Sequence, residues 1–339
     1  MKALRLEAVG KLAQRDVEPP APGPDGVVVR VEAAGICGTD RHLFKGEFPC
    51  RPPVTLGHEF SGLITQIGAD VRALRIGDRV TGDPNVACGR CPHCRSGRVN
   101  LCDALSAIGV HRDGGFAEYV VVPQTNAHFL PSYLNPEYGA FCEPLACCLH
   151  GLDMAGVVPG SSVVVLGGGV IGLLVVQLAR LAGAAKIVLS TRNPAKRALG
   201  ERVGATASVD PGGIDPVVAI AGSGGLIPGG ADAVFECAGV GETVAQAPML
   251  ARKGGAAVVL GVMPQGERVA IEPFDLVFRE IRLFGSFVNP FTHARAAALV
   301  ASGALEIEAL ITRRVGLSEA AGLIAQPPEP WEVKTLIVA

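Results

Sequence analysis

The sequence is poor in aromatic residues and in net charge. Aromatic residues make up 5% of the 339 residues, and 30 Lys and Arg stand against 32 Asp and Glu, which gives a formal charge of −2. Few aromatic side chains leave little to stack on bases, and a nearly neutral chain is not strongly attracted to phosphate backbones or anionic membranes. We therefore expect no nucleic-acid partner and no membrane partner.

We expect no secretory leader at the N-terminus. The N-terminus, MKALRLEAVG, interleaves charges where a signal peptide would need an apolar core. The one long apolar run, 163–179, contains three consecutive glycines and Gln177, so a buried strand that turns into a helix explains it better than a membrane span. We expect a cytoplasmic protein whose ten cysteines stay reduced.

Four of those cysteines stand close together, with the spacing C-x2-C-x2-C-x7-C. They are Cys88, Cys91, Cys94 and Cys102. Four thiolates fill the tetrahedral positions of one zinc ion and leave none open for a substrate, so the array predicts a structural zinc. Two disulfides or four unrelated thiols are the alternative, but this spacing suits a metal and nothing indicates secretion.

The pattern of the chain predicts two domains, because 339 residues are many for one core. The first part alternates β-rich runs with Gly and Pro turns, which is typical of a β-rich domain; the runs are 27–35, 60–68, 77–82 and 116–123. From about 160, strands and helices alternate, which predicts a parallel, doubly wound α/β sheet. The final run, TLIVA, can return as a strand to the first domain.

In the second part we expect strands at 162–167, 186–190, 232–239, 256–262 and 281–287. Helices are expected up to about 181, from 194, across 242–250 and, after the sheet, over 293–305. The glycine-rich stretch 221–230 is expected to be a surface turn.

Gly167, Gly169 and Gly172 follow the apolar strand SVVVL in the pattern G-x-G-x-x-G and open a helix. Such glycines let the backbone approach a pyrophosphate at a helix N-terminus, so the pattern predicts a dinucleotide site, although a glycine-rich turn without a ligand is possible. The expected cofactor contacts also include Val170 and Ile171 inside the pattern, and Gly261.

The next strand ends in Ser190-Thr191-Arg192-Asn193, without the Asp or Glu that usually holds the ribose 2′-hydroxyl of NAD. Arg192 instead offers positive charge to a 2′-phosphate, as do Lys196 and Arg197 on the following helix. We therefore expect NADP to be preferred over NAD. The alternative is that these are solvated surface cations.

The first domain carries further metal-binding side chains. Cys37, His58 and Glu143 supply one thiolate, one imidazole and one carboxylate, a set that leaves zinc an open position. Taken alone, a cysteine is more often a small core residue and a histidine a satisfied polar group, so composition by itself does not establish this site.

The order of these motifs resembles that of the zinc-containing medium-chain alcohol and polyol dehydrogenases over nearly the whole chain. The shared motifs are the 57–68 segment G-H-E-x-x-G-x5-G, the 77–80 segment GDRV, the four-cysteine lobe and G-x-G-x-x-G. GICGTD with EPLA looks most like the sorbitol-type branch. The resemblance implies a GroES-like catalytic domain over 1–152 and 289–339, a Rossmann domain over 153–288, and a homodimer or homotetramer.

The resemblance also implies two zinc ions per chain, one structural and one catalytic. It places Cys37 and His58 on the catalytic zinc, with Glu59 and Glu143 as direct or water-mediated ligands; which glutamate is direct stays open. It further implies that Thr39 stands beside the zinc-bound oxygen and that His42 ends a proton relay through the cofactor ribose.

The implied reaction transfers hydride between NADP(H) and a secondary alcohol, a polyol or sugar alcohol, or its ketone. The sorbitol-type branch has Phe-Arg-Tyr where this chain reads Phe287-Val288-Asn289, so sorbitol itself is not the expected substrate. An NAD-dependent threonine or amino-alcohol dehydrogenase, a non-catalytic nucleotide-binding homologue and a zinc-free quinone-type reductase are the alternatives. The substrate and the physiological direction stay open.

Overall fold

The computed structural model describes residues 1–338 and divides into two compact units. The first comprises Met1–Ala146 and the chain from Val288 onward, and the second comprises Cys147–Phe287, compared with predicted boundaries at 152/153 and 288/289. Each unit contains its own apolar core. Within the described residues, none of the helices combines the length and the apolar character needed to cross a membrane.

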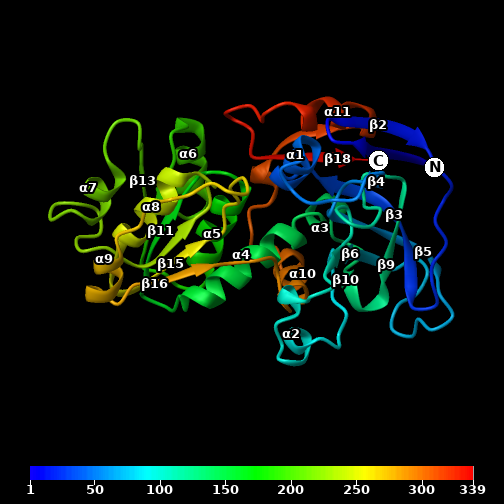
Figure 1. Cartoon of the computed structure of the whole chain (residues 1–339), viewed down its shortest axis with the longest axis horizontal. Coiled ribbons are helices and arrows are strands. Elements are labelled where there is room, and N and C mark those ends of the chain that lie inside the picture. The colour runs from blue at the N-terminus through cyan, green and yellow to red at the C-terminus, as the bar shows by residue number, and fades with distance from the viewer. Residues whose placement is uncertain (339) are drawn as a thin grey trace. The chain divides into compact units, whose positions relative to one another are not determined.

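The first unit is β-rich, as the sequence predicts (Figure 1). Its strands are β1 (Lys2–Ala8), β2 (Lys11–Asp16), β3 (Gly26–Gly35), β4 (Val54–Thr55), β5 (Glu59–Ile67), β6 (Arg79–Gly82), β7 (Asn85–Val86), β8 (Ser106–Ala107), β9 (Tyr119–Pro123), β10 (Ala127–Leu130), β17 (Ile311–Val315) and β18 (Lys334–Val338). Its helices are α1 (Gly38–Lys45), α2 (Pro92–Arg95), α3 (Pro136–Gly139), α10 (His293–Ala301) and α11 (Leu317–Ala325).

The largest sheet of this unit has the order β10-β6-β5-β3-β18-β17, with β9 also paired to β3. The last strand, β18, lies antiparallel to β3, where Leu336 pairs with Gly35. This confirms that the final apolar run returns to the first domain. The predicted runs at 27–35, 60–68, 77–82 and 116–123 correspond to β3, β5, β6 and β9.

The second unit is a parallel sheet in the order β13-β12-β11-β14-β15-β16, the doubly wound arrangement predicted (Figure 1). Its strands are β11 (Ser162–Leu166), β12 (Lys186–Ser190), β13 (Ala207–Val209), β14 (Ala231–Glu236), β15 (Ala251–Val259) and β16 (Arg282–Gly285). Its helices are α5 (Val170–Leu181), α6 (Pro194–Val203), α7 (Pro216–Ala221), α8 (Gly241–Leu250) and α9 (Pro273–Phe278). The valines of β11 are fully buried, which explains a continuous apolar run in place of an alternating one.

One helix, α4 (Cys142–Ala155), begins in the first unit and continues into the second. Its sequence, CEPLACCLHGLDMA, carries apolar residues around much of its circumference, and Leu145, Ala146 and Cys148 are fully buried. A helix buried on most sides lacks the polar stripe by which an amphipathic helix is recognised. The sequence therefore did not predict it.

A buried polar cluster lies between β6, β10 and α10. His293 is 1% exposed, its Nε2 lies 3.3 Å from Thr81 Oγ1 and its Nδ1 lies 3.3 Å from Asn289 Nδ2. Its ring stacks on that of His128 with centroids 4.8 Å apart. Burial and the neighbouring His128 hold the pKa of His293 well below its ordinary value of 6.5. The fold therefore requires a neutral imidazole here.

This cluster predicts an acid-sensitive contribution to stability. Below pH 6.5, near the ordinary pKa of histidine, the unfolded chain takes up a proton that folded His293 excludes, so the contribution is complete above that pH and is lost as the pH falls. The free energy of unfolding should therefore fall by up to about 1.4 kcal/mol per pH unit between pH 6.5 and 5 from this group.

Urea unfolding of the wild type and of His293→Gln over that range measures the effect. The pKa of Asp83, which burial raises to about 6, contributes with the opposite sign but is present in both proteins, so the difference between the two slopes isolates His293. Equal slopes would contradict the assignment.

Candidate active site

The first metal-binding group is formed where β3 and β5 run side by side. Ligand atoms of Cys37, His58 and Glu59 all lie within 4.8 Å of one another. Cys37 follows β3 and caps α1, and Glu59 opens β5 directly opposite Gly35 of β3. The antiparallel register therefore brings together residues that are about twenty positions apart in the sequence.

Asp40 is hydrogen-bonded to the backbone of Cys37 and lies beside the ring of His58. This carboxylate is fully buried, accepts a hydrogen bond from Cys37 N at 2.8 Å, and lies 3.5 Å from His58 Nδ1. Because Nδ1 faces Asp40, Nε2 is the His58 nitrogen available to a metal. Burial alone would lower the pKa of His58, but the charges of Asp40 and Cys37 outweigh burial and raise it well above its ordinary value. This surplus of negative charge fits a cation.

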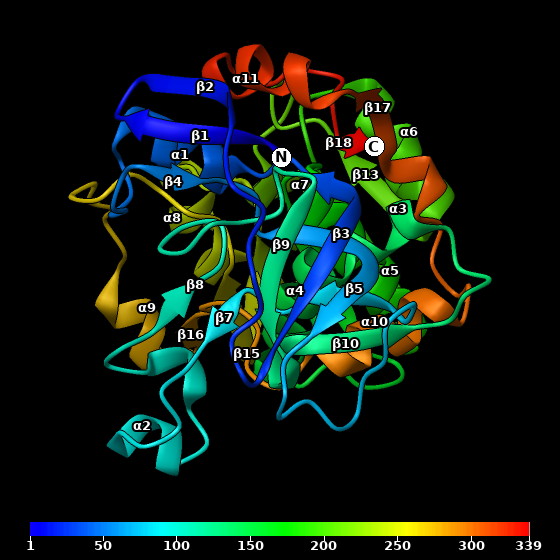
Figure 2. The ribbon, with the colours of Figure 1, turned by 90° about the vertical axis from the view of Figure 1, so that its right-hand side faces the viewer.

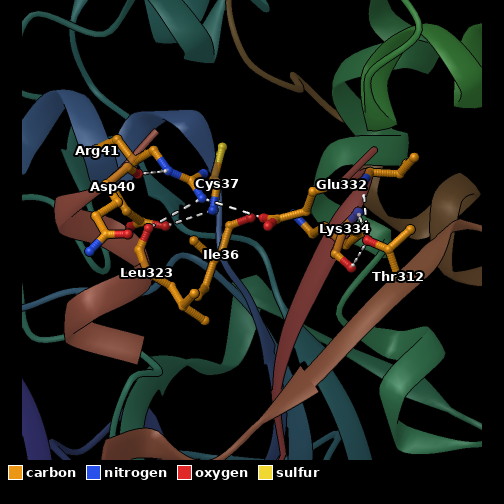
Figure 3. A network of polar contacts seen from close by, with 10 residues as sticks. Ile36, Cys37, Asp40, Arg41, Thr312, Leu323, Glu332 and Lys334 are labelled. Carbon is orange, nitrogen blue, oxygen red and sulfur yellow. Dashed lines mark hydrogen bonds and ion pairs between the residues drawn. The ribbon is translucent and has the colours of Figure 1, made fainter. Parts of the chain in front are cut away.

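Glu59 is held by a buried lysine from the far end of the chain. Lys334 and Glu59 are each 1% exposed and form an ion pair, and Lys334 Nζ also donates to Ile36 O at 3.1 Å. Figure 3 shows Ile36, Cys37 and Lys334 within one network of polar contacts. A Cβ added at Gly35 would overlap both Glu59 Oε2 and Lys334 Cε, so a larger residue at this crossing would displace the ion pair.

Glu143, the other candidate ligand, lies on the first turn of α4 and is 7% exposed. Among the residues that the structure describes, it is not part of the group whose ligand atoms lie within 4.8 Å of one another. The grouping therefore places Glu59 nearer to Cys37 and His58 than Glu143.

The two residues expected to handle the proton lie together on α1. Thr39 is in its first turn and His42 is in its last. A spacing of three residues puts both side chains on one face of a helix. His42 Nδ1 lies 2.6 Å from the carboxylate of Glu47, which directly follows the end of the helix.

The four-cysteine lobe forms as predicted. The Sγ atoms of Cys88, Cys91, Cys94 and Cys102 lie within 4.8 Å of one another. Figure 2 shows this lobe extending at the lower left, with α2 beyond the short β7–β8 pair.

Backbone amides of the lobe point at the sulfurs. Cys88 N donates to Cys102 Sγ at 3.3 Å and Cys94 N donates to Cys91 Sγ at 3.5 Å. Amides from Arg90 and Cys91 lower the pKa of Cys88 to about 6. Burial and the neighbouring thiols instead raise the pKa of Cys94 to about 12. Hydrogen bonds from the amides favour the thiolate form that zinc requires.

The predicted dinucleotide turn joins β11 to α5. Gly167 has a φ of 109°, which a side chain would strain, and a Cβ at Gly172 would overlap Gly167 O. Gly169, the N-cap of α5, has no side chain to satisfy the first amides of that helix. Val170 and Ile171 open the helix. Free amides at a helix N-terminus suit an anionic group such as a pyrophosphate.

A buried carboxylate holds the loop beside this turn. Glu236, at the carboxyl end of β14, accepts hydrogen bonds from Ala238 N and Gly239 N, both at 2.8 Å, and from Thr243 Oγ1 at 2.7 Å. A Cβ at Gly261 would lie 2.5 Å from Glu236 Oε2. The predicted contact Gly261 therefore lies against the same loop.

The residues expected to choose between the two cofactors lie at the carboxyl end of β12. A Cβ at Gly168 would lie 2.8 Å from Thr191 Oγ1, so Thr191 packs against the glycine turn. The Arg192 side chain is 76% exposed and lies 3.4 Å from Glu242. Arg197 donates to the carbonyls of Thr191 and Arg192 at 2.8 and 2.7 Å and pairs with Asp210. Lys196 follows on the first turn of α6, where its amide is capped by Asn193.

Sequence reasoning missed Asp40, Lys334 and Glu236 as parts of these sites. Asp40 stood inside the quoted motif GICGTD, three residues after Cys37, where its position was a usable signal. Lys334 directly precedes the final apolar run TLIVA, and a lysine that is drawn into a buried strand needs a partner, although the sequence does not say which one.

Comparison with known proteins agrees with this geometry. A family model for the alcohol dehydrogenase GroES-like domain matches residues 23–132, and one for zinc-binding dehydrogenases matches residues 170–302. The chain belongs to the zinc-containing medium-chain alcohol and polyol dehydrogenase family. It is therefore an oxidoreductase with a GroES-like domain and a Rossmann domain.

Two curated relatives and one solved structure show the breadth of this likeness. D-arabitol-phosphate dehydrogenase of Enterococcus avium is 33% identical over 99% of this chain and 97% of its own length. L-threonine 3-dehydrogenase of Deinococcus deserti is 33% identical over 94% of this chain and 93% of its own. A putative zinc-binding dehydrogenase from Sinorhizobium meliloti 1021, bound to NADP, is 62% identical, with a TM-score of 0.98 and coverage of 100% and 99%.

Substituting a cysteine in each of the two candidate metal groups should have different effects on stability and activity. Cys88→Ser should lower the melting temperature and the zinc content, because a closed thiolate site contributes folding free energy, on the order of 10 kcal/mol in small peptide sites and less in a domain with its own core. Cys37→Ser should keep the fold and abolish turnover. Calorimetry, metal analysis and activity assays on both variants check this.

Cys50→Ser is the matched control, since Cys50 belongs to neither group. An unchanged melting temperature in Cys88→Ser, or unfolding of Cys37→Ser, would show that the two roles are assigned wrongly.

Proposed function

We propose that this chain oxidises a secondary alcohol, a polyol or sugar alcohol, to its ketone with NADP, and that it carries one catalytic and one structural zinc. The observation that carries the proposal is the buried group of Cys37, His58 and Glu59 in one chain with a dinucleotide turn. A separate four-cysteine lobe accounts for the second zinc.

The donor set fits a reactive metal. One thiolate, one imidazole and one carboxylate leave a position for substrate, whereas four thiolates do not. When bound, zinc supplies a Lewis acid that lowers the pKa of an alcohol, and NADP supplies the hydride acceptor. Cys37 and His58 would hold the metal, with Glu59 or Glu143 beside it. Thr39 orients the substrate hydroxyl, and His42 accepts the released proton at Nε2 and passes it to solvent.

The surroundings of Thr191 and Arg192 support NADP over NAD. The carboxylate that would repel a 2′-phosphate is absent at the end of β12, and Arg192 extends into solvent with an exposed partner, Glu242. Because Arg197 already donates to two backbone carbonyls and to Asp210, we assign it to shaping the loop and assign the phosphate contact to Arg192.

The residues at 287–289 bear on the substrate. Asn289 is 1% exposed, and its Oδ1 accepts from Asn85 Nδ2 at 2.7 Å, so this side chain is committed to the polar cluster around His293. Val288 carries no polar group. A guanidinium contact to a polyol is therefore missing here, which supports a polyol other than sorbitol.

The edge of the parallel sheet supports the expected homodimer or homotetramer. Within residues 1–338, β16 pairs on one side with β15 and ends the sheet. Phe274 and Phe278 on the adjacent α9 are 59% and 69% exposed and stack on each other. An open strand edge beside exposed aromatic rings is a surface that a partner covers.

A threonine or amino-alcohol dehydrogenase is the second candidate, favoured by the similarity to L-threonine 3-dehydrogenase. Formation of NADPH and NADH from a panel of polyols, sugar alcohols, polyol phosphates and L-threonine separates the two. The proposal expects turnover of a polyol with NADP that disappears after zinc removal and returns with zinc. The proposal would be rejected if L-threonine were the only compound oxidised, or if oxidation occurred with NAD and not with NADP.

Cofactor choice yields a prediction on affinity. A charge-assisted hydrogen bond contributes roughly 1.5–3 kcal/mol, so Arg192 should favour NADP over NAD by about ten- to a hundredfold, and Arg192→Ala should remove most of that preference. Thr191→Asp should go further and favour NAD, since it restores an acceptor for the ribose and repels the phosphate.

Dissociation constants for both cofactors, measured by calorimetry, test this prediction. Arg202→Ala, which removes an exposed cation from the same helix α6, is the matched control and should leave the ratio unchanged. A wild type that prefers NAD, or an Arg192→Ala variant with the wild-type ratio, would contradict the assignment.

A further inference from the structure

The chain reversal at the end of α1 brings the side chains of His42 and Glu47 together. α1 ends at Lys45 and is capped by Gly46, whose φ of 74° turns the chain back, and Glu47 N donates to His42 O at 2.9 Å. This turn returns the Glu47 side chain to the helix it has just left, with Oε2 at 2.6 Å from His42 Nδ1. The side chain of His42 is 24% exposed and that of Glu47 is 33% exposed, so solvent reaches both members of the pair.

The carboxylate decides which ring nitrogen of His42 is free. An ionised carboxylate accepts hydrogen bonds and donates none, so Nδ1 carries the proton of this contact. In the neutral ring, Nε2 is then left with a lone pair and can receive a proton. The same negative charge stabilises the imidazolium that results.

Most of the other charged side chains on and near α1 contact groups other than His42, and Lys45 is exposed. Arg41 turns to α11, donating to Gln326 O at 3.1 Å and lying 3.4 Å from Glu332. Glu319 on α11 accepts from Gly316 N at 3.2 Å, Asp40 accepts from Cys37 N, and Lys45 lies exposed in the last turn. Phe48 covers the ring from the side, with centroids 6.2 Å apart. Among the described residues, the carboxylate bonded to His42 is that of Glu47.

We propose that Glu47 is a positioning residue for proton transfer: it fixes His42 with Nε2 as the accepting atom and stabilises the ring after it has taken the proton. The proposal rests on the proposed function, in which His42 passes the proton of the alcohol to solvent. Nothing in the proposed chemistry of the metal or the cofactor involves Glu47.

Two substitutions separate charge from orientation. Glu47→Gln keeps an oxygen that can accept from Nδ1 but removes the charge, so alcohol oxidation should retain its plateau within about threefold. Its acid limb should move to lower pH, because the negative charge that favours the protonated ring is gone. Glu47→Ala loses the acceptor as well, and its plateau should fall about tenfold, a part of the effect typical of acid–base groups.

The pH profile of kcat/KM is measured for the wild type, both Glu47 variants, His42→Ala and the double variant His42→Ala/Glu47→Gln. The shift should vanish in the His42→Ala background, because the carboxylate acts through that ring. Asp16→Asn, which removes an exposed carboxylate on β2, is the control and should leave the limb in place. A merely structural role of Glu47 would lower the plateau without moving the limb.

A second measurement uses the cofactor-free protein. The His42 ring signal in NMR spectra, identified by its loss in His42→Ala, should titrate with a midpoint at lower pH in Glu47→Gln. If the midpoint of the His42 titration is the same in Glu47→Gln as in the wild type, Glu47 does not influence the ring and the proposal is wrong. If that midpoint moves but the acid limb of kcat/KM does not, Glu47 has no role in proton transfer. Failure to oxidise any alcohol rejects the proposed function, and the ring titration then still decides whether Glu47 sets the state of His42.

Discussion

The ion pair between Glu59 and Lys334 joins the metal-binding residues to the last strand of the chain. Both groups are almost completely buried, so each charge depends on the other, and removing one partner from a buried pair costs about 3–5 kcal/mol. The contact forms only because β18 lies beside β3 and because Gly35 leaves room for both side chains. The position of Glu59 therefore depends on the pairing of β18 with β3.

The surroundings of His58 concentrate acidic groups. Asp40 and Glu59 are almost completely buried and Cys37 is partly buried, and burial makes the repulsion between negative charges stronger than it would be in water. Burial also opposes the ammonium of Lys334, yet the charges of Glu59 and Cys37 outweigh that effect and raise its pKa above the ordinary value. One lysine balances only part of this charge. A divalent cation between Cys37 and His58 would balance the remainder, which is a physical reason for a metal at this position.

The features that depend on local sequence patterns were predicted correctly. The β-rich first domain, the alternating second domain, the four-cysteine lobe and the helix starts at Val170 and Pro194 all follow from patterns that are read within a few residues. The buried helix α4 was missed because it lacks a polar stripe. The link between Lys334 and Glu59 was missed because it depends on the pairing of strands far apart in the sequence, and no local signal names the partner of a buried charge.

The two proposed binding regions hold their charged side chains in opposite environments. The cage of Cys37, His58 and Glu59 is largely enclosed, so its electrostatics are little screened by salt and change only when the packing changes. Arg192 is largely exposed, and its ion pair with Glu242 is screened and weak. In the proposed function, a substitution at Arg192 or Thr191 would therefore alter cofactor choice without disturbing the sheet beneath it, whereas one at Lys334 or Gly35 would disturb both the fold and the candidate metal site. Within one chain, cofactor preference can thus change more readily than the reactive centre.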